Sequence, residues 1–170
     1  MRRIKVIKKT WLVLPLLLVG LGLAGCESSF STGFNKDLLS GLQVTNDGLS
    51  YDDAYITVDG EKTQENSFAV GDKVVMNFEG VDYYELVDGK AFPGAALLVT
   101  DLNGKEMLRE DDLFAAYAET GASPEDASIL TVALTIGNPM ISGEKYKWQA
   151  HIWDRKSDGV IDGSMDIVVK

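Results

Sequence analysis

The stretch YKWQAHIWDRKSDGVIDGSMDIVV, residues 146–169, decides the fold. In its first half, large apolar residues alternate with polar ones: Tyr146, Trp148, Ala150 and Ile152 are separated by Lys147, Gln149 and His151. In its second half the same period runs through Ile161, Gly163, Met165, Ile167 and Val169. A period of two is that of a β-strand with one buried and one wet face. The Asp158-Gly159 pair between the halves is typical of a hairpin turn, so we expect two antiparallel strands.

Earlier segments of the chain carry the same signal. Alternating or continuous apolar residues occupy 54–58, 74–78, 95–99 and 130–136, and turn sequences such as Asp59-Gly60 and Asn103-Gly104 separate them. Short strands at regular spacing, each with one apolar face, indicate an antiparallel sandwich. The sequence therefore predicts an all-β, immunoglobulin-like β-sandwich.

One short helical region is expected near 111–127. Asp111 or Asp112 is suited to cap a turn, and Ser123-Pro124-Glu125-Asp126 combines a serine cap with a proline at the first helical position. We expect a capped turn that leads into the strand beginning near Leu130.

The last third of the chain resembles the E–F–G portion of an immunoglobulin or fibronectin-type sandwich. Tyr146 stands where such domains place the tyrosine-corner residue at the start of strand F. Two residues later, where an antibody domain has its second cysteine, this chain has Trp148. The resemblance therefore implies the general sandwich architecture and not an antibody-type domain.

The N-terminal residues have the pattern of an export signal. Five basic residues are followed by the apolar stretch from Trp11 to Leu23 and then by Leu23-Ala24-Gly25-Cys26. This ending resembles the bacterial lipobox, which implies cleavage before Cys26, acylation of its thiol and attachment to a membrane of the cell envelope. Glu27 follows the cysteine, where lipoproteins of the inner membrane typically carry aspartate, so the outer membrane is favoured and the leaflet stays open. The apolar stretch is too short to span a bilayer as a helix.

We accordingly expect three segments: a signal peptide at 1–25, a lipidated cysteine and tether at 26–48, and a sandwich domain at 49–170. Five of the 16 basic residues and none of the 26 acidic residues precede Cys26, so residues 26–170 carry a net charge of −15. Such acidity argues against a nucleic-acid partner. Cys26 is the chain's single cysteine, so no disulfide is expected and the fold must rest on an apolar core. A lipobox, a tether and one acidic sandwich together resemble many envelope lipoproteins, which implies no particular activity.

A candidate contact surface follows from the aromatic residues. Trp153 falls among the polar positions of its strand, together with His151 and Gln149, while Tyr83 and Tyr84 follow Gly80 in a loop-like stretch. Exposed rings beside polar groups would suit a sugar ring or a loop of a protein partner. Alternatively, Trp153 covers an edge of the sandwich and the tyrosines pack at the base of a loop.

Calcium and catalytic chemistry have weaker signals. Asp154, Asp158 and Asp162 have the spacing of calcium-loop positions, but Lys156 and Met165 occupy two positions that need oxygen ligands. Paired acids such as Asp52-Asp53 stand on hydrophilic turns, where carboxylates are solvated. His151 is the only histidine, and no nucleophile motif accompanies it. We therefore expect a lipid-anchored, non-catalytic binding or structural module with no cofactor besides the covalent lipid. A glycan-binding protein and a small carboxylate-dependent hydrolase are the alternatives.

Overall fold

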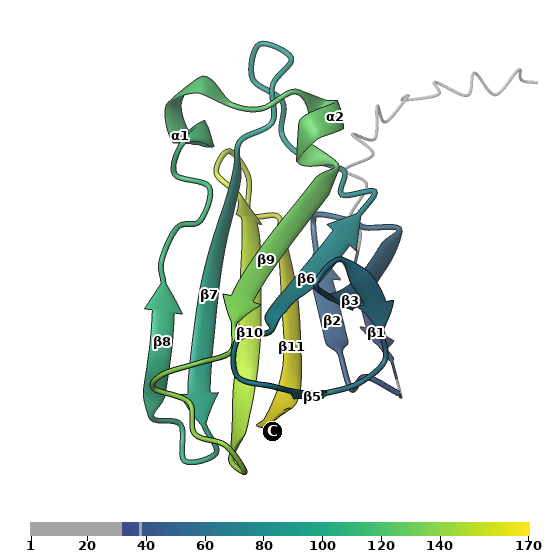
Figure 1. Cartoon of the computed structure of the whole chain (residues 1–170). Coiled ribbons are helices and arrows are strands. Elements are labelled where there is room, and N and C mark those ends of the chain that lie inside the picture. Colours follow the sequence, from purple (N-terminus) through teal and green to yellow (C-terminus); the bar gives the residue numbers. More distant parts are fainter. Residues whose placement is uncertain (1–31, 38) are drawn as a thin grey trace, which may run out of the picture.

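The computed structural model describes residues 32–37 and 39–170, which form a sandwich of two sheets (Figure 1). The larger sheet has seven strands in the order β1-β2-β11-β10-β7-β8, with β5 paired to β11, and the smaller has four in the order β4-β3-β6-β9. The larger sheet contains β1 (Thr32–Lys36), β2 (Gln43–Asp47), β5 (Ser67–Phe68), β7 (Pro93–Asp101), β8 (Glu106–Glu110), β10 (Lys145–Asp154) and β11 (Val160–Val169). The smaller sheet contains β3 (Asp53–Val58), β4 (Glu61–Thr63), β6 (Lys73–Glu79) and β9 (Ile129–Thr135). The predicted all-β fold is confirmed.

The strand order is that of an immunoglobulin-type sandwich. Strands β3, β6 and β9 take the places of A, B and E in one sheet, and β8, β7, β10 and β11 take those of C′, C, F and G in the other. The last three strands thus hold the E, F and G positions predicted for them. Every described strand pair is antiparallel except β5 with β11.

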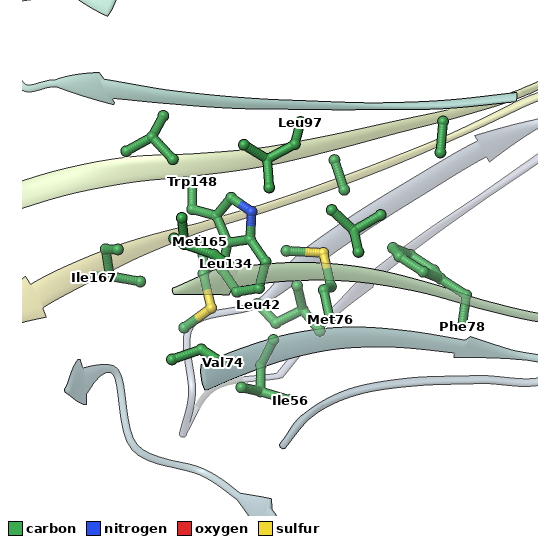
Figure 2. Close-up of a cluster of buried hydrophobic side chains, with 14 of the residues drawn as sticks. Leu42, Ile56, Val74, Met76, Phe78, Leu97, Leu134, Trp148, Met165 and Ile167 are labelled. Atoms are coloured by element: carbon green, nitrogen blue, oxygen red, sulfur yellow. The ribbon is translucent and has the colours of Figure 1, made fainter. Parts of the chain in front are cut away.

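The apolar core lies between the two sheets (Figure 2). On β10 the even-numbered residues are buried and the odd-numbered ones are not, as the alternation predicted, and Trp148 is fully enclosed. Gly163 on β11 marks a close approach of the sheets: a Cβ atom there would lie 2.5 Å from Met76 Sδ and 2.9 Å from Phe78 Cζ. A side chain at this position would therefore force Met76 or Phe78 to shift, which glycine avoids.

Tyr146 forms the corner that its position suggested. The ring is buried, and the phenol oxygen accepts a hydrogen bond from the backbone N–H of Ile141 at 2.8 Å. This bond ties the loop before β10 to the strand, as a tyrosine corner does.

The predicted tether at 26–48 is wrong for the residues that form β1 and β2. Strand β2 pairs with β11, β1 pairs with β2, and Leu42 and Val44 are buried in the core. The folded domain therefore includes Thr32–Lys36 and Gln43–Asp47 rather than starting at 49. Local sequence missed this because the hairpin has few apolar residues, and its pairing partner lies more than a hundred residues away along the chain. Cys26 and the signal at 1–25 lie outside the described residues.

The region expected to be helical contains two short helices, α1 (Tyr117–Thr120) and α2 (Pro124–Ala127). Ser123 caps α2 as predicted, since its Oγ accepts the backbone N–H of Asp126 at 3.0 Å. The hairpin between β10 and β11 is confirmed as well, although its loop spans residues 155–159. Within the described residues, no helix is long and apolar enough to cross a membrane.

Candidate functional site

A concavity of about 440 Å³ lies on the outer face of the larger sheet, the face turned away from the core. Six strands line it, from β1 at one edge of the sheet to β8 at the other. Both edges contribute, so the sheet curls toward its outer face. We call this concavity the outer groove; its lining residues are Phe34, Gln43, Thr45, Ala96, Leu97, Leu98, Arg109, Gln149, Ala150, His151, Asp162, Gly163 and Ser164.

Strand register arranges the side chains of the groove in two rows that cross the sheet. One row runs Gln43, Ser164, Gln149 and Leu98, and the next runs Thr45, Asp162, His151 and Ala96. The described part of the chain supplies no hydrogen-bond partner to the side chains of Gln43, Gln149 and Ser164. Their amide and hydroxyl groups therefore face the groove with their full capacity to donate and accept.

The charged groups of the groove are matched within the protein. His151 Nδ1 lies 2.7 Å from Asp162 Oδ1 across the β10–β11 pair. Arg109 on β8 donates to Glu106 at 2.8 Å, and its Nη1 lies 3.4 Å from Asp111 Oδ1. The hydrogen bond and charge of Glu106 raise the pKa of the guanidinium above its usual value. These pairs leave the groove without an unmatched charge.

Trp153 shares the outer face with the groove but is partly covered. Its ring lies over Gly94 on β7, where a Cβ atom would come within van der Waals overlap of the indole. His151 stacks on one side, with ring centroids 5.5 Å apart and planes inclined by 23°. The guanidinium carbon of Arg155 lies 5.4 Å from the Trp153 ring centroid. The indole is therefore half-buried beside the groove, which corrects the expectation of an exposed ring toward the alternative in which neighbouring groups cover it.

The two candidate tyrosines lie elsewhere. Both follow β6 in a loop at one end of the sandwich, and neither lines the groove. Tyr83 is exposed, whereas Tyr84 is half-buried and donates its hydroxyl to the Ala127 carbonyl at 3.2 Å. Burial, with the nearby charge of Asp154 and Asp82, raises the pKa of the Tyr84 phenol. Tyr84 thus packs at the base of a loop, the alternative that the sequence left open, and a contact surface that includes Tyr83 stays a prediction.

The three aspartates of the calcium-loop hypothesis have separate surroundings. Asp154 is buried, and its carboxylate accepts from the backbone N–H groups of Glu85 and Lys156 and from Ser157 Oγ, at 2.8, 3.1 and 2.7 Å. Asp162 pairs with His151, and Asp158 is exposed. Among residues 32–37 and 39–170, no three metal-ligating side chains gather in a group that could hold an ion. Asp154 thus organises the β10–β11 loop through protein hydrogen bonds.

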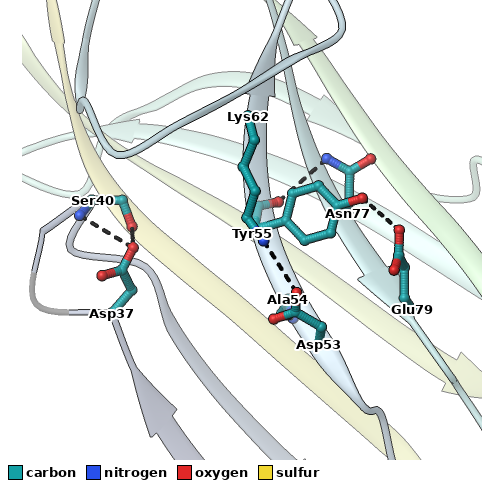
Figure 3. A network of polar contacts seen from close by, with 8 residues as sticks. All are labelled: Asp37, Ser40, Asp53, Ala54, Tyr55, Lys62, Asn77 and Glu79. Atoms are coloured by element: carbon teal, nitrogen blue, oxygen red, sulfur yellow. Dashed lines mark hydrogen bonds and ion pairs between the residues drawn. The ribbon is translucent and has the colours of Figure 1, made fainter.

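The outer face of the smaller sheet provides a contrast, because its polar groups bind one another (Figure 3). Tyr55 donates its hydroxyl to Glu79, and the Lys62 ammonium lies 3.9 Å from the centroid of the Tyr55 ring. Asn77 donates to Tyr55 O and Thr57 Oγ1 at 3.3 and 3.2 Å. The hydrogen bond to Glu79 raises the pKa of Tyr55. The polar groups of this network therefore bind one another, whereas the side chains of Gln43, Gln149 and Ser164 in the outer groove remain available to a ligand.

Sequence reasoning found Gln149, His151 and Asp162 but missed Phe34, Gln43, Thr45 and Arg109, which line the groove from three other strands. Residues 32–47 fall within the predicted tether at 26–48, and Arg109 falls just before the helical region expected near 111–127. The alternation of Leu42, Val44 and Asn46 with Gln43 and Thr45 was the available signal for β2.

No family model matches the chain, and no curated protein matches it in sequence. Among solved structures, the fold is similar to that described as the crystal structure of the C-terminal domain of wzt. The two share 12% sequence identity with a TM-score of 0.46, over 83% of this chain and 78% of the other. We draw no conclusion about function from this similarity.

Proposed function

We propose that the protein is a lipid-anchored, non-catalytic binding module of the bacterial cell envelope, and that the outer groove binds a neutral carbohydrate. The carrying observation is the set of amide and hydroxyl side chains in the groove that have no partner in the described part of the chain: Gln43, Gln149 and Ser164. Polar side chains of this kind in a concavity are typical of binding sites, where a ligand completes their hydrogen bonds.

A carbohydrate suits this lining chemically. Sugar hydroxyls donate and accept at once, as do the side chains of Gln149 and Ser164. The C–H faces of sugar rings need apolar surface, which Phe34 and Leu98 supply on opposite sides of the groove. A ligand bound here would therefore contact polar and apolar groups together.

Charge favours a neutral ligand over an anionic one. Arg109 is paired with Glu106 and Asp111, and His151 with Asp162. Each basic side chain that lines the groove therefore already has an acidic partner within the protein. The net charge of −15 on residues 26–170 adds a general repulsion of anions.

A carboxylate-dependent hydrolase has less support at this site. Glycoside hydrolysis uses two carboxylates facing each other across the substrate. Of the residues that line the groove, Asp162 alone carries a carboxylate, and it is bound to His151.

The anchor is proposed from Leu23-Ala24-Gly25-Cys26, and the outer membrane from Glu27. Expressed in a Gram-negative host fed radioactive palmitate, the wild type should incorporate label and Cys26→Ala should not. Ser28→Ala, two residues away, is the matched control and should be labelled normally. Label on Cys26→Ala would contradict the anchor.

Binding is tested by titrating the protein with neutral oligosaccharides of glucose, mannose and N-acetylglucosamine in a calorimeter. Gln149→Ala should weaken binding of the responsive sugar about ten-fold, the equivalent of about 1.4 kcal/mol. Lys147→Ala lies on the same strand and the same face but outside the lining, so it should bind like wild type. No binding of any of these sugars, or equal losses in the two variants, would reject the carbohydrate proposal.

A further inference from the structure

The chain enters the sandwich at one defined end. Thr32, the first residue of β1, pairs with Asp47, which pairs with Val160, which pairs with Trp153. This row borders the loops at 48–52, 80–92, 111–128 and 155–159, which we call the anchor end. Figure 1 shows α1 and α2 at this end and the C-terminus at the opposite one. The segments at 39–42, 102–105 and 136–144 form that opposite end, the far end.

The length of chain before Thr32 determines which end lies near the membrane. Five residues lie between Cys26 and Thr32, and the six steps from Cα to Cα span roughly 20 Å even when fully extended. Strand β10, with ten residues, extends roughly 30 Å along the sandwich. With the strands upright on the membrane, a lipid on Cys26 therefore cannot hold the far end at the surface, whereas the anchor end lies within reach.

The anchor end carries apolar side chains on an ordered loop. Tyr83 and Leu86 are 51% and 50% exposed, and Val87 is 40% exposed. Val87 and Lys90 exchange backbone hydrogen bonds of 3.0 Å around Asp88 and Gly89, whose φ angles are 52° and 74°. Positive φ at both central residues describes a tight type I′ turn, so the loop holds its apolar residues in a fixed shape.

A second segment adds to this surface. Leu113, before α1, is 38% exposed, and Tyr117, the first residue of α1, is 39% exposed. Ala91 and Ala122 exchange backbone hydrogen bonds of 3.0 and 2.8 Å, which join the loop at 80–92 to the segment at 111–128. The apolar surface of the anchor end is therefore supplied by two connected segments.

Charge shows how this end would meet a bilayer. The loop at 80–92 carries Asp82, Glu85 and Asp88 against Lys90, so anionic headgroups would repel it. Tyrosine and leucine side chains instead favour the boundary between headgroups and acyl chains. Contact would thus be shallow and apolar, and it would add to the covalent anchor rather than replace it.

We infer that the anchor end rests on the bilayer that holds the Cys26 lipid, with Leu86 and Val87 at the membrane interface. This inference depends on the proposed acylation of Cys26. Because the groove lies on a side face of the sandwich, it stays open to ligands while the anchor end is covered.

The test uses the full lipidated protein in phosphatidylcholine vesicles that contain lipids with a nitroxide near the headgroup. A tryptophan is introduced at Leu86→Trp, or as matched control at Leu102→Trp, which is 67% exposed at the far end. Fluorescence is compared with that of the unsubstituted protein, which corrects for Trp148 and Trp153. The tryptophan at 86 should be quenched about two-fold, and the one at 102 should be unaffected.

Flotation of the vesicles, read on the same samples, separates the two proposals. Protein that floats without quenching at 86, or with equal quenching at 86 and 102, keeps the anchor and overturns the orientation. Quenching of Phe34→Trp in place of Leu86→Trp would mean that the domain lies on its β1 edge, which also overturns the orientation. Protein that neither floats nor carries lipid would overturn the anchor and the orientation together.

Discussion

The two faces of the larger sheet consist of alternate residues of the same strands, yet they follow different rules. The inner face is filled with apolar side chains, and Trp148 is enclosed although the described residues offer no partner to its Nε1. The outer face holds amides and hydroxyls that no described residue binds, such as Gln149 and Ser164. On the inner face, filling the space between the sheets contributes more to stability than satisfying every hydrogen bond, since the Nε1 donor of Trp148 has no described partner. On the outer face, the chemistry of each side chain matters, while its volume is of little consequence.

The largest expected effect of this difference is at neighbouring positions of β10. Trp148→Ala should lower the free energy of unfolding by about 3–5 kcal/mol, because it leaves a large cavity between the sheets. Lys147→Ala, on the outer face, should change it by less than about 0.5 kcal/mol. Urea unfolding measures both, and similar losses would contradict the assignment of the faces.

A smaller loss is expected where the sheets come closest. Gly163→Ala should cost about 1–3 kcal/mol, because the added methyl group meets Met76 and Phe78 of the opposite sheet. Gly137→Ala is the matched control, since a Cβ atom there meets nothing within 4 Å. If the two variants unfold at the same urea concentration, the sheets are less tightly packed than described.

Trp153 is intermediate between the two faces, because it lies on the outer face yet is half-buried over Gly94. Trp153→Ala should cost about 1–2 kcal/mol, more than an ordinary surface change and less than the loss at Trp148. Sequence alternation alone predicts a loss within about 1 kcal/mol. Urea unfolding beside Trp148→Ala gives the ranking, and a loss as large as that variant's would place the indole in the core.

The smallest expected effect is a null response to calcium. Asp154 is occupied by three protein donors, and Asp162 by His151, so millimolar calcium should leave the melting temperature unchanged. Asp158→Asn should behave identically with and without calcium. A rise of several degrees in wild type that Asp158→Asn abolishes would establish a calcium site in the loop at 155–159.

Sequence was a reliable guide wherever structure depends on neighbouring residues. The alternation around Trp148 predicted the strand and its buried face, and Ser123 predicted its helix cap. The hydroxyl of Tyr146 makes the corner bond expected from its place before strand F. In each case a period of two or a short-range hydrogen bond carries the information.

Pairing between distant segments was beyond that reasoning. Strand β2 is stabilised by β11, and β8 by β7, while neither has a long apolar pattern of its own. Because β1, β2 and β8 were missed, the two walls of the outer groove were missed with them. In the sequence, Asp154 likewise resembles a calcium ligand. No local pattern shows that the backbone N–H of Glu85, far away along the chain, donates a hydrogen bond to it.

By itself, then, the sequence determined the all-β class, the strands of the central sandwich and the side chains that face inward, because burial imposes a period that every strand must obey. The sequence also predicts export and lipid anchoring in the cell envelope, which stay predictions. Only the tertiary structure decided that β1 and β2 extend the larger sheet, that this sheet curls into a groove, and that Trp153 lies over Gly94. These features depend on which strands become neighbours, and that choice reflects the free energy of the whole packed domain rather than the preference of any one segment.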